Sequence, residues 1–234
     1  MWQGKKKALT FSFDDGVKQD LRLIKILNKY GLKATFNINS LCLGKKGAVW
    51  VSGKKVKHDK VSERQLALYK GHEIAAHTLT HPFLTSLDEE GIVYEVEEDR
   101  KNLERLTGQK VVGMAYPGGG VNHDERVAEV ISRRTSICYA RTIISTDSLA
   151  VEREDLFRYH PTCHILAENL DEIVDEFLSY DGEKALLYIW GHAYELDAGN
   201  ANPNGMGWKK FDALCKKLSQ KADIFYATNA EILL

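Results

Sequence analysis

Two histidines four positions apart are the residues of this sequence best suited to bind a metal ion. They lie in His77-Thr-Leu-Thr-His81, which follows a short apolar segment and precedes Pro82. On a helix, this spacing would place both imidazoles on one face. Because the residue before a proline avoids the helical region, we expect a turn at the end of a strand instead. Two imidazoles and a nearby carboxylate would form a three-ligand divalent site that leaves a position for water.

The motif Asp14-Asp15-Gly16 offers carboxylates at the end of another apolar, β-prone segment. With nitrogen and oxygen ligands, zinc is the first expectation, while cobalt, nickel, manganese and iron stay open. Each motif also has a purely structural interpretation, because histidine pairs are often incidental and Asp-Asp-Gly can cap a helix and form a turn. A functional interpretation therefore depends on whether the fold brings these motifs together.

Short apolar segments alternate with amphipathic segments along the chain. The patterns predict strands at residues 8–13, 33–39, 73–77, 111–116, 137–141, 185–190 and 224–227. They predict helices at residues 21–31, 62–69, 88–106, 170–180 and 208–221, and one more that begins at a cap formed by Asn122 and Glu125. We interpret the acidic run 88–99 as the solvated face of an amphipathic helix rather than a metal site.

This alternation predicts an α/β protein with a parallel sheet, and about seven such units are most economically closed into a TIM-like barrel. We find no interdomain linker and treat residues 1–234 as one domain. The irregular segments are a candidate hairpin at 41–61 and two further rim loops at 144–169 and 194–207.

Active sites of parallel barrels lie at the C-terminal ends of the strands. The chemically useful residues at the predicted ends are Asp14, Asp15, His77, His81, Tyr116, Pro117, Gly118, Arg141 and His192. Taken singly, His192 could be a core histidine and Arg141 a structural ion-pair partner. Their joint placement at one end of the predicted barrel favours a functional interpretation.

The composition is that of an average globular domain, since 44% of the 234 residues are hydrophobic and 28% are charged. Disordered and fibrous classes are therefore excluded. The net charge of −1 singles out neither nucleic acid nor a membrane as a partner. Residues 1–60 hold 14 basic and 4 acidic side chains, which we interpret as solvated lysines rather than a site for an anionic polymer.

The cysteines and the N-terminal segment bear on the cellular compartment. Four widely spaced cysteines predict reduced core thiols. No apolar run reaches the roughly 18 residues of a membrane span. The apolar segment after Lys5–Lys7 is too short for a signal peptide, so we expect a cytoplasmic protein unless a leader has been removed.

Four motifs, in this order, carry a resemblance to a known family. They are TFSFDDG at 10–16, HTLTHP at 77–82, AYPGG at 115–119 and YIWGHAYE at 188–195. The chain resembles the polysaccharide deacetylases of carbohydrate esterase family 4, the NodB-homology group. The resemblance implies a distorted (β/α)7 barrel and a divalent-metal-dependent deacetylase.

The resemblance also implies a role for each matching residue. The metal ligands would be Asp15, His77 and His81. Asp14 would be the general base, since a carboxylate that coordinates a cation is a poor proton acceptor and its neighbour stays free. His192 would be the general acid, and the backbone N–H of Gly118 would join the metal in binding the oxyanion.

Two features depart from the pattern of the family. Ala115 stands where the family usually has an arginine that contacts the catalytic base, and we hypothesise that Arg141 reaches Asp14 instead. The Asp-Trp motif of the family has no clear counterpart. Asp147 is a candidate, and the segment His160–His164 could fill the space with different chemistry, although both histidines could equally lie in the core or at the surface.

Aromatic side chains near the predicted rim could stack on a sugar ring. The candidates are Trp50, Tyr116, Trp190, Tyr194 and Trp208. We expect Tyr116, Tyr194 and Trp208, with the neighbouring Pro117, to contact substrate. Trp190 falls inside an apolar strand and is predicted to belong to the core.

The sequence thus predicts a metal-dependent hydrolase that removes acetyl groups from N-acetylated, or alternatively O-acetylated, sugars of a glycan or oligosaccharide. A hydrolase of small non-glycan amides or cyclic ureides is an alternative, favoured if the loops 41–61 and 194–207 close over the site. A non-catalytic metal- or glycan-binding module is another, supported by Ala115 and opposed by the presence of Asp14 and His192. The sequence gives no prediction of the oligomeric state.

Overall fold

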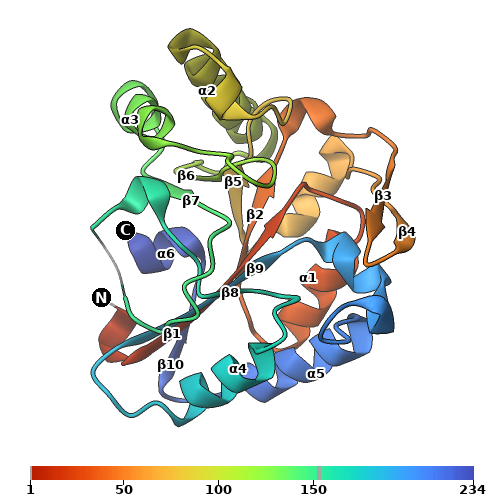
Figure 1. Ribbon diagram of the computed structural model, residues 1–234, viewed down its shortest axis with the longest axis vertical. Helices are drawn as coiled ribbons and strands as arrows, with labels where there is room; N and C mark the ends of the chain where they lie inside the picture. The colour runs from red at the N-terminus through yellow and green to blue at the C-terminus, as the bar shows by residue number, and fades with distance from the viewer. Residues whose placement is uncertain (1, 152–153) are drawn as a thin grey trace.

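The computed structural model describes residues 2–151 and 154–234, and a curved parallel sheet lies at its centre (Figure 1). Among these residues the sheet has eight strands: β1 (Lys7–Asp14), β2 (Ala34–Ile38), β5 (Glu73–Ala76), β6 (Gly113–Ala115), β7 (Tyr139–Arg141), β8 (Cys163–His164), β9 (Ala185–Gly191) and β10 (Ile224–Tyr226). Their order is β7-β6-β5-β2-β1-β9-β8, with β10 also paired to β1. Parallel pairing directs the C-terminal ends of these strands to one edge.

The two outer strands of this order, β7 and β8, are connected through the segment 159–162. The N–H of Tyr159 donates to the carbonyl of Ala140 at 3.0 Å, and the N–H of Thr142 donates to the carbonyl of Tyr159 at 2.9 Å. Beyond it, the N–H of Asp147 donates to the carbonyl of Thr162 at 2.9 Å. The sheet is thus a distorted (β/α)7 barrel whose closure is irregular, as predicted, although the strand β8 inside the loop 144–169 was not foreseen.

Helices surround the sheet: α1 (Asp20–Lys29), α2 (Glu89–Thr107), α3 (Glu125–Arg134), α4 (Leu170–Ser179), α5 (Trp208–Leu218) and α6 (Asn229–Leu233). Figure 1 shows α2 and α3 together next to β5, β6 and β7, and α1, α4 and α5 together on the other side. The predicted helix at 62–69 is the 3₁₀ helix η3 (Glu63–Tyr69), with the expected capping box of Ser62 and Gln65.

Two details of the helix predictions are wrong. The cap of α3 is Asp124, whose side chain accepts from the N–H of Val127 at 2.8 Å. Asn122 instead donates to the carbonyls of Tyr116 and Gly118 and so shapes the loop after β6. The short helix α6 was not predicted, because five residues carry too little periodicity to be recognised.

The predicted hairpin consists of β3 (Ala48–Val51) and β4 (Lys54–Lys57), which pair in antiparallel fashion outside the main sheet. It is bound to the segment after β9, which contains the 3₁₀ helix η6 (Ala193–Asp197). Ser52 Oγ donates to Asn202 Oδ1 at 2.9 Å, and Lys54 Nζ donates to the carbonyl of Asp197 at 2.8 Å. The loops 41–61 and 194–207 therefore lie against each other.

The strand β1 is the centre of the core, since all eight of its residues are buried. Phe11 and Phe13 each meet Phe211 of α5 edge-on at 6.0 Å, which fixes the strand against that helix. The four cysteines are free thiols, but Cys138 is exposed rather than in the core. In the described ranges, the helices are too short or too polar to cross a bilayer.

Candidate metal centre and catalytic site

The C-terminal strand ends gather the predicted residues around one cavity of about 250 Å³. The lining side chains and backbone come from β1, β9 and the loops after β5, β6, β7 and β9: Asp14, Asp15, His77, His81, Tyr116, Gly118, Gly119, Ile143, Trp190, His192 and Tyr194. These segments are far apart in sequence, and only the parallel sheet brings their ends to the same place. Arg141 is buried behind this lining, on Asp14.

Three of these residues offer a plausible metal-ligand set. Ligand atoms of Asp15, His77 and His81 all lie within 4.8 Å of one another. His77 Nδ1 lies 2.9 Å from the carbonyl oxygen of Ala115, so this nitrogen donates and leaves Nε2 free. Burial lowers the pKa of His77 to about 4 and also lowers the pKa of His81, which keeps both imidazoles neutral at pH 7. Neutral imidazoles and an ionised carboxylate fit a divalent ion.

The backbone that carries these ligands is held in an uncommon conformation. Asp15, Thr78 and His81 have φ angles of 83°, 66° and 69°, in the left-handed region that non-glycine residues seldom adopt. The segment His77–His81 is therefore a turn at the end of β5 and not a helix, as predicted. Such strain persists only where surrounding contacts enforce it, and it is concentrated at functional sites.

Two buried acids of α2 supply those contacts. Asp99 accepts from the N–H of Ser40 at 2.7 Å and from the N–H of His77 at 2.9 Å. Glu95 accepts from the N–H and the hydroxyl of Thr80 at 2.9 and 2.7 Å. Our interpretation of the acidic run as a solvated face is thus wrong for these two residues, which face inward and fix the histidine loop.

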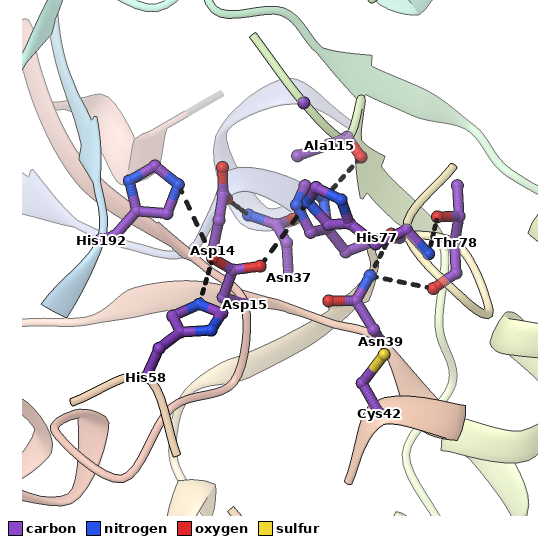
Figure 2. Close-up of polar contacts among 12 residues, drawn as sticks. Asp14, Asp15, Asn37, Asn39, Cys42, His58, His77, Thr78, Ala115 and His192 are labelled. Atoms are coloured by element: carbon purple, nitrogen blue, oxygen red, sulfur yellow. Dashed lines mark hydrogen bonds and ion pairs between the residues drawn. The ribbon is translucent and has the colours of Figure 1, made fainter. Parts of the chain in front are cut away.

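Asp15 is bound by two residues that sequence analysis missed, both from the segment after the hairpin. Lys60 Nζ lies 3.0 Å from Asp15 Oδ1 and donates to the carbonyl of Asp15 at 2.8 Å. His58 contacts the other carboxylate oxygen, with Nε2 3.0 Å from Oδ2, as Figure 2 shows. Burial alone would raise the pKa of Asp15, but the hydrogen bond of His58 and the charge of Lys60 hold it well below its usual range.

Asp14 lies beside the ligand set and has its own partners. The Arg141 guanidinium forms a buried ion pair with Asp14 Oδ2, and Asn37 donates to Oδ1 at 2.7 Å. Arg141 therefore contacts Asp14, as we hypothesised when we found Ala115 at the position where an arginine was expected. Although burial alone would raise the pKa of Asp14, the charge of Arg141 lowers it, so this carboxylate is ionised and can accept a proton.

His192 is connected to a carboxylate three residues further along the chain. Its Nδ1 lies 3.2 Å from Glu195 Oε1, and its backbone N–H donates to Oε2 at 2.8 Å. His164 Nε2 lies 3.4 Å from the same Oε2. Burial alone would lower the pKa of His192, but the charge and hydrogen bond of Glu195, with Asp15 and Asp14, raise it to about 9. His192 is thus protonated at neutral pH, as a general acid requires.

Glu195 is the carboxylate partner of His192, a contact that sequence analysis missed. Asp147, our sequence candidate, is hydrogen-bonded through its backbone to Thr162 and is not among the residues lining this cavity. The spacing of His192 and Glu195, which matches a capping box, was the available signal. His164 belongs to this cluster, whereas His160 lies 2.6 Å from Thr142 Oγ1 and lines a neighbouring cavity.

The aromatic predictions are only partly matched by the structure. Tyr116 and Tyr194 line the cavity, and Tyr194 lies against both His58 and His192 with ring centres 4.9 Å apart in each case. Trp190, which we assigned to the core, is buried but also lines the cavity, and its ring lies 4.6 Å from the Arg141 guanidinium.

Two expected substrate contacts and one rim aromatic lie elsewhere. Trp208 Nε1 donates to Asp197 Oδ1 at 2.7 Å, and Arg22 lies over its ring at 4.5 Å, so this indole joins α1 to α5. Pro117 is buried and is not among the residues lining the cavity. Trp50 is 70% exposed on the hairpin.

Gly118 lies in the loop after β6 with φ 83°, a conformation that favours glycine. A Cβ at this position would come within 2.7 Å of the Phe83 ring, so the backbone can lie this close to Phe83 only because residue 118 has no side chain. The backbone of Gly118 therefore faces the cavity at a position that no larger residue could take without strain.

Comparisons with known proteins agree with this architecture. The family profile described as polysaccharide deacetylase matches residues 3–133. The solved structure of a T48 deacetylase with substrate is 19% identical, with a TM-score of 0.58 over 99% of this chain and 92% of that chain. None of the curated proteins that we compared matches the chain significantly.

Two further solved structures share the fold. A mutant of BA3943, described as a family 4 carbohydrate esterase pseudoenzyme with restored enzymatic activity, is 20% identical, with a TM-score of 0.54 over 99% of this chain and 68% of that chain. The deacetylase PplD of Streptococcus pyogenes, in complex with acetate, is 20% identical, with a TM-score of 0.52 over 64% of this chain. The match spans 61% of the PplD chain.

The barrel is of the NodB-homology class. Because the family profile covers more than half of its residues, the chain belongs to the polysaccharide deacetylase family, carbohydrate esterase family 4.

Proposed function

We propose that this protein is a divalent-metal-dependent deacetylase that hydrolyses N-acetyl groups of a glycan or oligosaccharide, with O-acetyl esters as a second possible linkage. The observation that carries the proposal is the arrangement at one cavity of a two-histidine, one-aspartate ligand set, Asp14 in an ion pair with Arg141, and His192 in contact with Glu195. A module that only binds metal or glycan has no use for the last two groups.

In the proposed mechanism, Asp15, His77 and His81 would hold the ion, for which we propose zinc. The bound ion would lower the pKa of a water molecule and polarise the acyl carbonyl. Asp14 accepts a proton from the attacking water, and Arg141 and Asn37 fix the orientation of its carboxylate. The N–H of Gly118 donates to the oxyanion that forms on the acyl carbon.

His192 completes the reaction by donating its proton to the departing amine nitrogen as the acyl C–N bond breaks. The hydroxyl of the water stays on the acyl carbon, so the products are acetate and the free amino sugar. Glu195 holds His192 Nδ1 and leaves Nε2 available on the cavity side. For an O-acetyl substrate the proton goes to the departing alkoxide oxygen, and the same residues act.

The decisive experiment is acetate release from a panel of N-acetylated and O-acetylated saccharides by metal-reloaded protein. We expect release by the wild-type protein and none by Asp14→Ala. Asp14→Ala should still bind one divalent ion per chain, because its ligand set is intact, and this metal content is the control. Absence of release from every saccharide by protein that contains one ion per chain would contradict the proposal.

A second candidate is a hydrolase of small non-glycan amides or cyclic ureides. Two observations favour it: the cavity measures only about 250 Å³, and the loops 41–61 and 194–207 are joined to each other beside it. A panel that includes N-acetylated small amides and cyclic ureides separates the two candidates by comparing kcat/KM on saccharides and on small molecules.

A further inference from the structure

The segment after the hairpin contributes a buried cation to the carboxylate that we assign to the metal. Lys60 is 8% exposed, and its ammonium contacts both the side chain and the backbone carbonyl of Asp15. The backbone on both sides of Lys60 is fixed, since the N–H of Lys18 donates to the carbonyl of Asp59 at 2.8 Å and the N–H of Val61 donates to the carbonyl of Gly16 at 2.9 Å. Lys60 is therefore part of the site and not a mobile surface lysine.

The charges around the cavity are balanced in pairs. Asp14 is matched by Arg141, and Asp15 is matched by Lys60. Glu195 is matched by His192. Asp15 therefore has a buried cationic partner before any metal binds. A divalent ion at Asp15 would share its carboxylate with an ammonium, and like charges at short range in a buried site repel strongly.

We propose that Lys60 is an internal counter-ion of Asp15: it balances the charge of this carboxylate and keeps it in place in the absence of metal, and it makes the site bind metal more weakly than its three ligands would without it. The proposal rests on the proposed metal site. It predicts a folded metal-free protein and an ion that exchanges readily with the medium, because the site does not depend on the ion for its charge balance.

The test is the affinity for Zn²⁺, measured by competition with a chromophoric chelator, in wild type, Lys60→Met and Lys60→Gln. Both substitutions remove the competing charge, so we expect zinc binding to become tighter by about tenfold or more. The matched control is Lys55→Met, which removes the same charge from an exposed position of β4. Its affinity should stay within about twofold of wild type, because solvent screens a charge at the surface.

Two further readouts separate this role from a merely structural one. The absorption spectrum of bound Co²⁺ should be the same in wild type and the Lys60 variants, which shows that the ligand set is unchanged. The metal-free Lys60 variants should melt at a lower temperature than metal-free wild type, and Zn²⁺ should raise their melting temperature more than that of wild type. Two variants of different polarity are used so that a folding defect in one does not remove the test.

The outcomes distinguish the inference from the proposed function. If wild type binds zinc and releases acetate but the Lys60 variants bind zinc as weakly as wild type or more weakly, only the role of Lys60 is overturned. If wild type binds no divalent ion, the proposed metal site itself is overturned. Tighter binding in both Lys60 variants with unchanged affinity in Lys55→Met supports the proposal.

Discussion

Arg141 has no exposed surface, and its guanidinium lies between the carboxylate of Asp14 and the ring of Trp190. It also donates to the carbonyl of Thr142 at 3.0 Å. The guanidinium thus combines a charge, a directed hydrogen bond and a flat face for stacking, a combination that lysine lacks. Arg141 therefore contacts Asp14, as we hypothesised from the sequence.

Replacing Arg141 should damage both catalysis and stability. Arg141→Ala leaves a buried carboxylate without its partner, so we expect kcat/KM to fall by about 100-fold or more and the free energy of unfolding to fall by about 3–5 kcal/mol. Arg141→Lys should retain more stability but not full activity, because its ammonium cannot stack on Trp190. Saccharide deacetylation and urea unfolding measure the two effects, and a fully active Arg141→Ala would overturn the assignment.

Glu195 is expected to act through His192 rather than on the substrate. Glu195→Gln removes the charge that raises the pKa of His192, so the acid should lose its proton at lower pH than in wild type. We predict that the alkaline limb of the kcat/KM profile moves to lower pH, with KM little changed. An unshifted limb in an active, folded variant would show that Glu195 does not set the protonation of His192.

At the scale of elements, α2 holds the histidine loop His77–His81 and the segment after β2 in place. Because Asp99 accepts from the backbone of both Ser40 and His77, one side chain joins the segments after β2 and β5. Glu95 holds the next residues of the same histidine loop. The uncommon backbone angles at Thr78 and His81 are maintained from outside the loop, by a helix that contributes no residue to the cavity lining.

Asp99→Ala should therefore destabilise the protein and weaken metal binding together. Two buried N–H groups would lose their acceptor, which costs about 2–5 kcal/mol of unfolding free energy. The matched control is Glu98→Ala on the same helix, where an exposed ion pair with Lys101 is worth at most about 1 kcal/mol. Chemical denaturation and zinc competition on both variants check the prediction, and equal effects in the two variants would contradict it.

At the scale of the whole molecule, His72 joins the sheet to the helix layer. Its Nδ1 accepts from the N–H of Ala34 at the start of β2, and its Nε2 lies 3.1 Å from Asn28 Oδ1 of α1. This arrangement requires the neutral imidazole with its proton on Nε2. Burial, with a smaller contribution from Lys33, lowers the pKa of His72 to about 4.

The pH dependence of stability follows from that shift. Between pH 6.5 and about 4 the unfolded chain binds a proton at this histidine that the folded protein does not bind. The contribution of His72 is thus complete above about pH 6.5 and is lost progressively as the pH falls toward 4, amounting to up to about 3 kcal/mol. Unfolding free energies measured over this range should fall less steeply in His72→Gln than in wild type; parallel curves would refute the assignment.

The opposite end of the barrel is closed by polar contacts that connect distant parts of the chain. Glu73 at the start of β5 accepts from Thr35 of β2 at 2.7 Å, from Tyr139 of β7 at 2.9 Å and from the N–H of Ala230 in α6 at 3.0 Å. The two ends of the barrel thus differ. The C-terminal strand ends place charged groups around a cavity, whereas at the N-terminal ends the hydrogen bonds of the buried Glu73 carboxylate join β2, β7 and α6.

Local sequence determined the regular elements and the motifs at their ends. The continuous apolar runs and their short length were sufficient to predict the central strands. β1, β2 and β9 are buried along their whole length, so their sequences differ from the periodic apolar pattern of the amphipathic helices. The turn at His81 could be predicted because Pro82 restricts the residue before it. The predicted ligand set lies together because all these motifs follow strands of one parallel sheet.

Only the tertiary structure decided which charges meet inside the site. Lys60, His58, Glu195 and Asp99 are ordinary polar residues in sequence, with solvated loops and helix faces as their natural interpretation. The prediction for Trp208 was wrong in the other direction. This side chain was expected to contact substrate, but it joins α1 to α5. The physical reason is the same in each case: side-chain burial and pairing depend on contacts between segments distant in sequence, and no local pattern records those contacts.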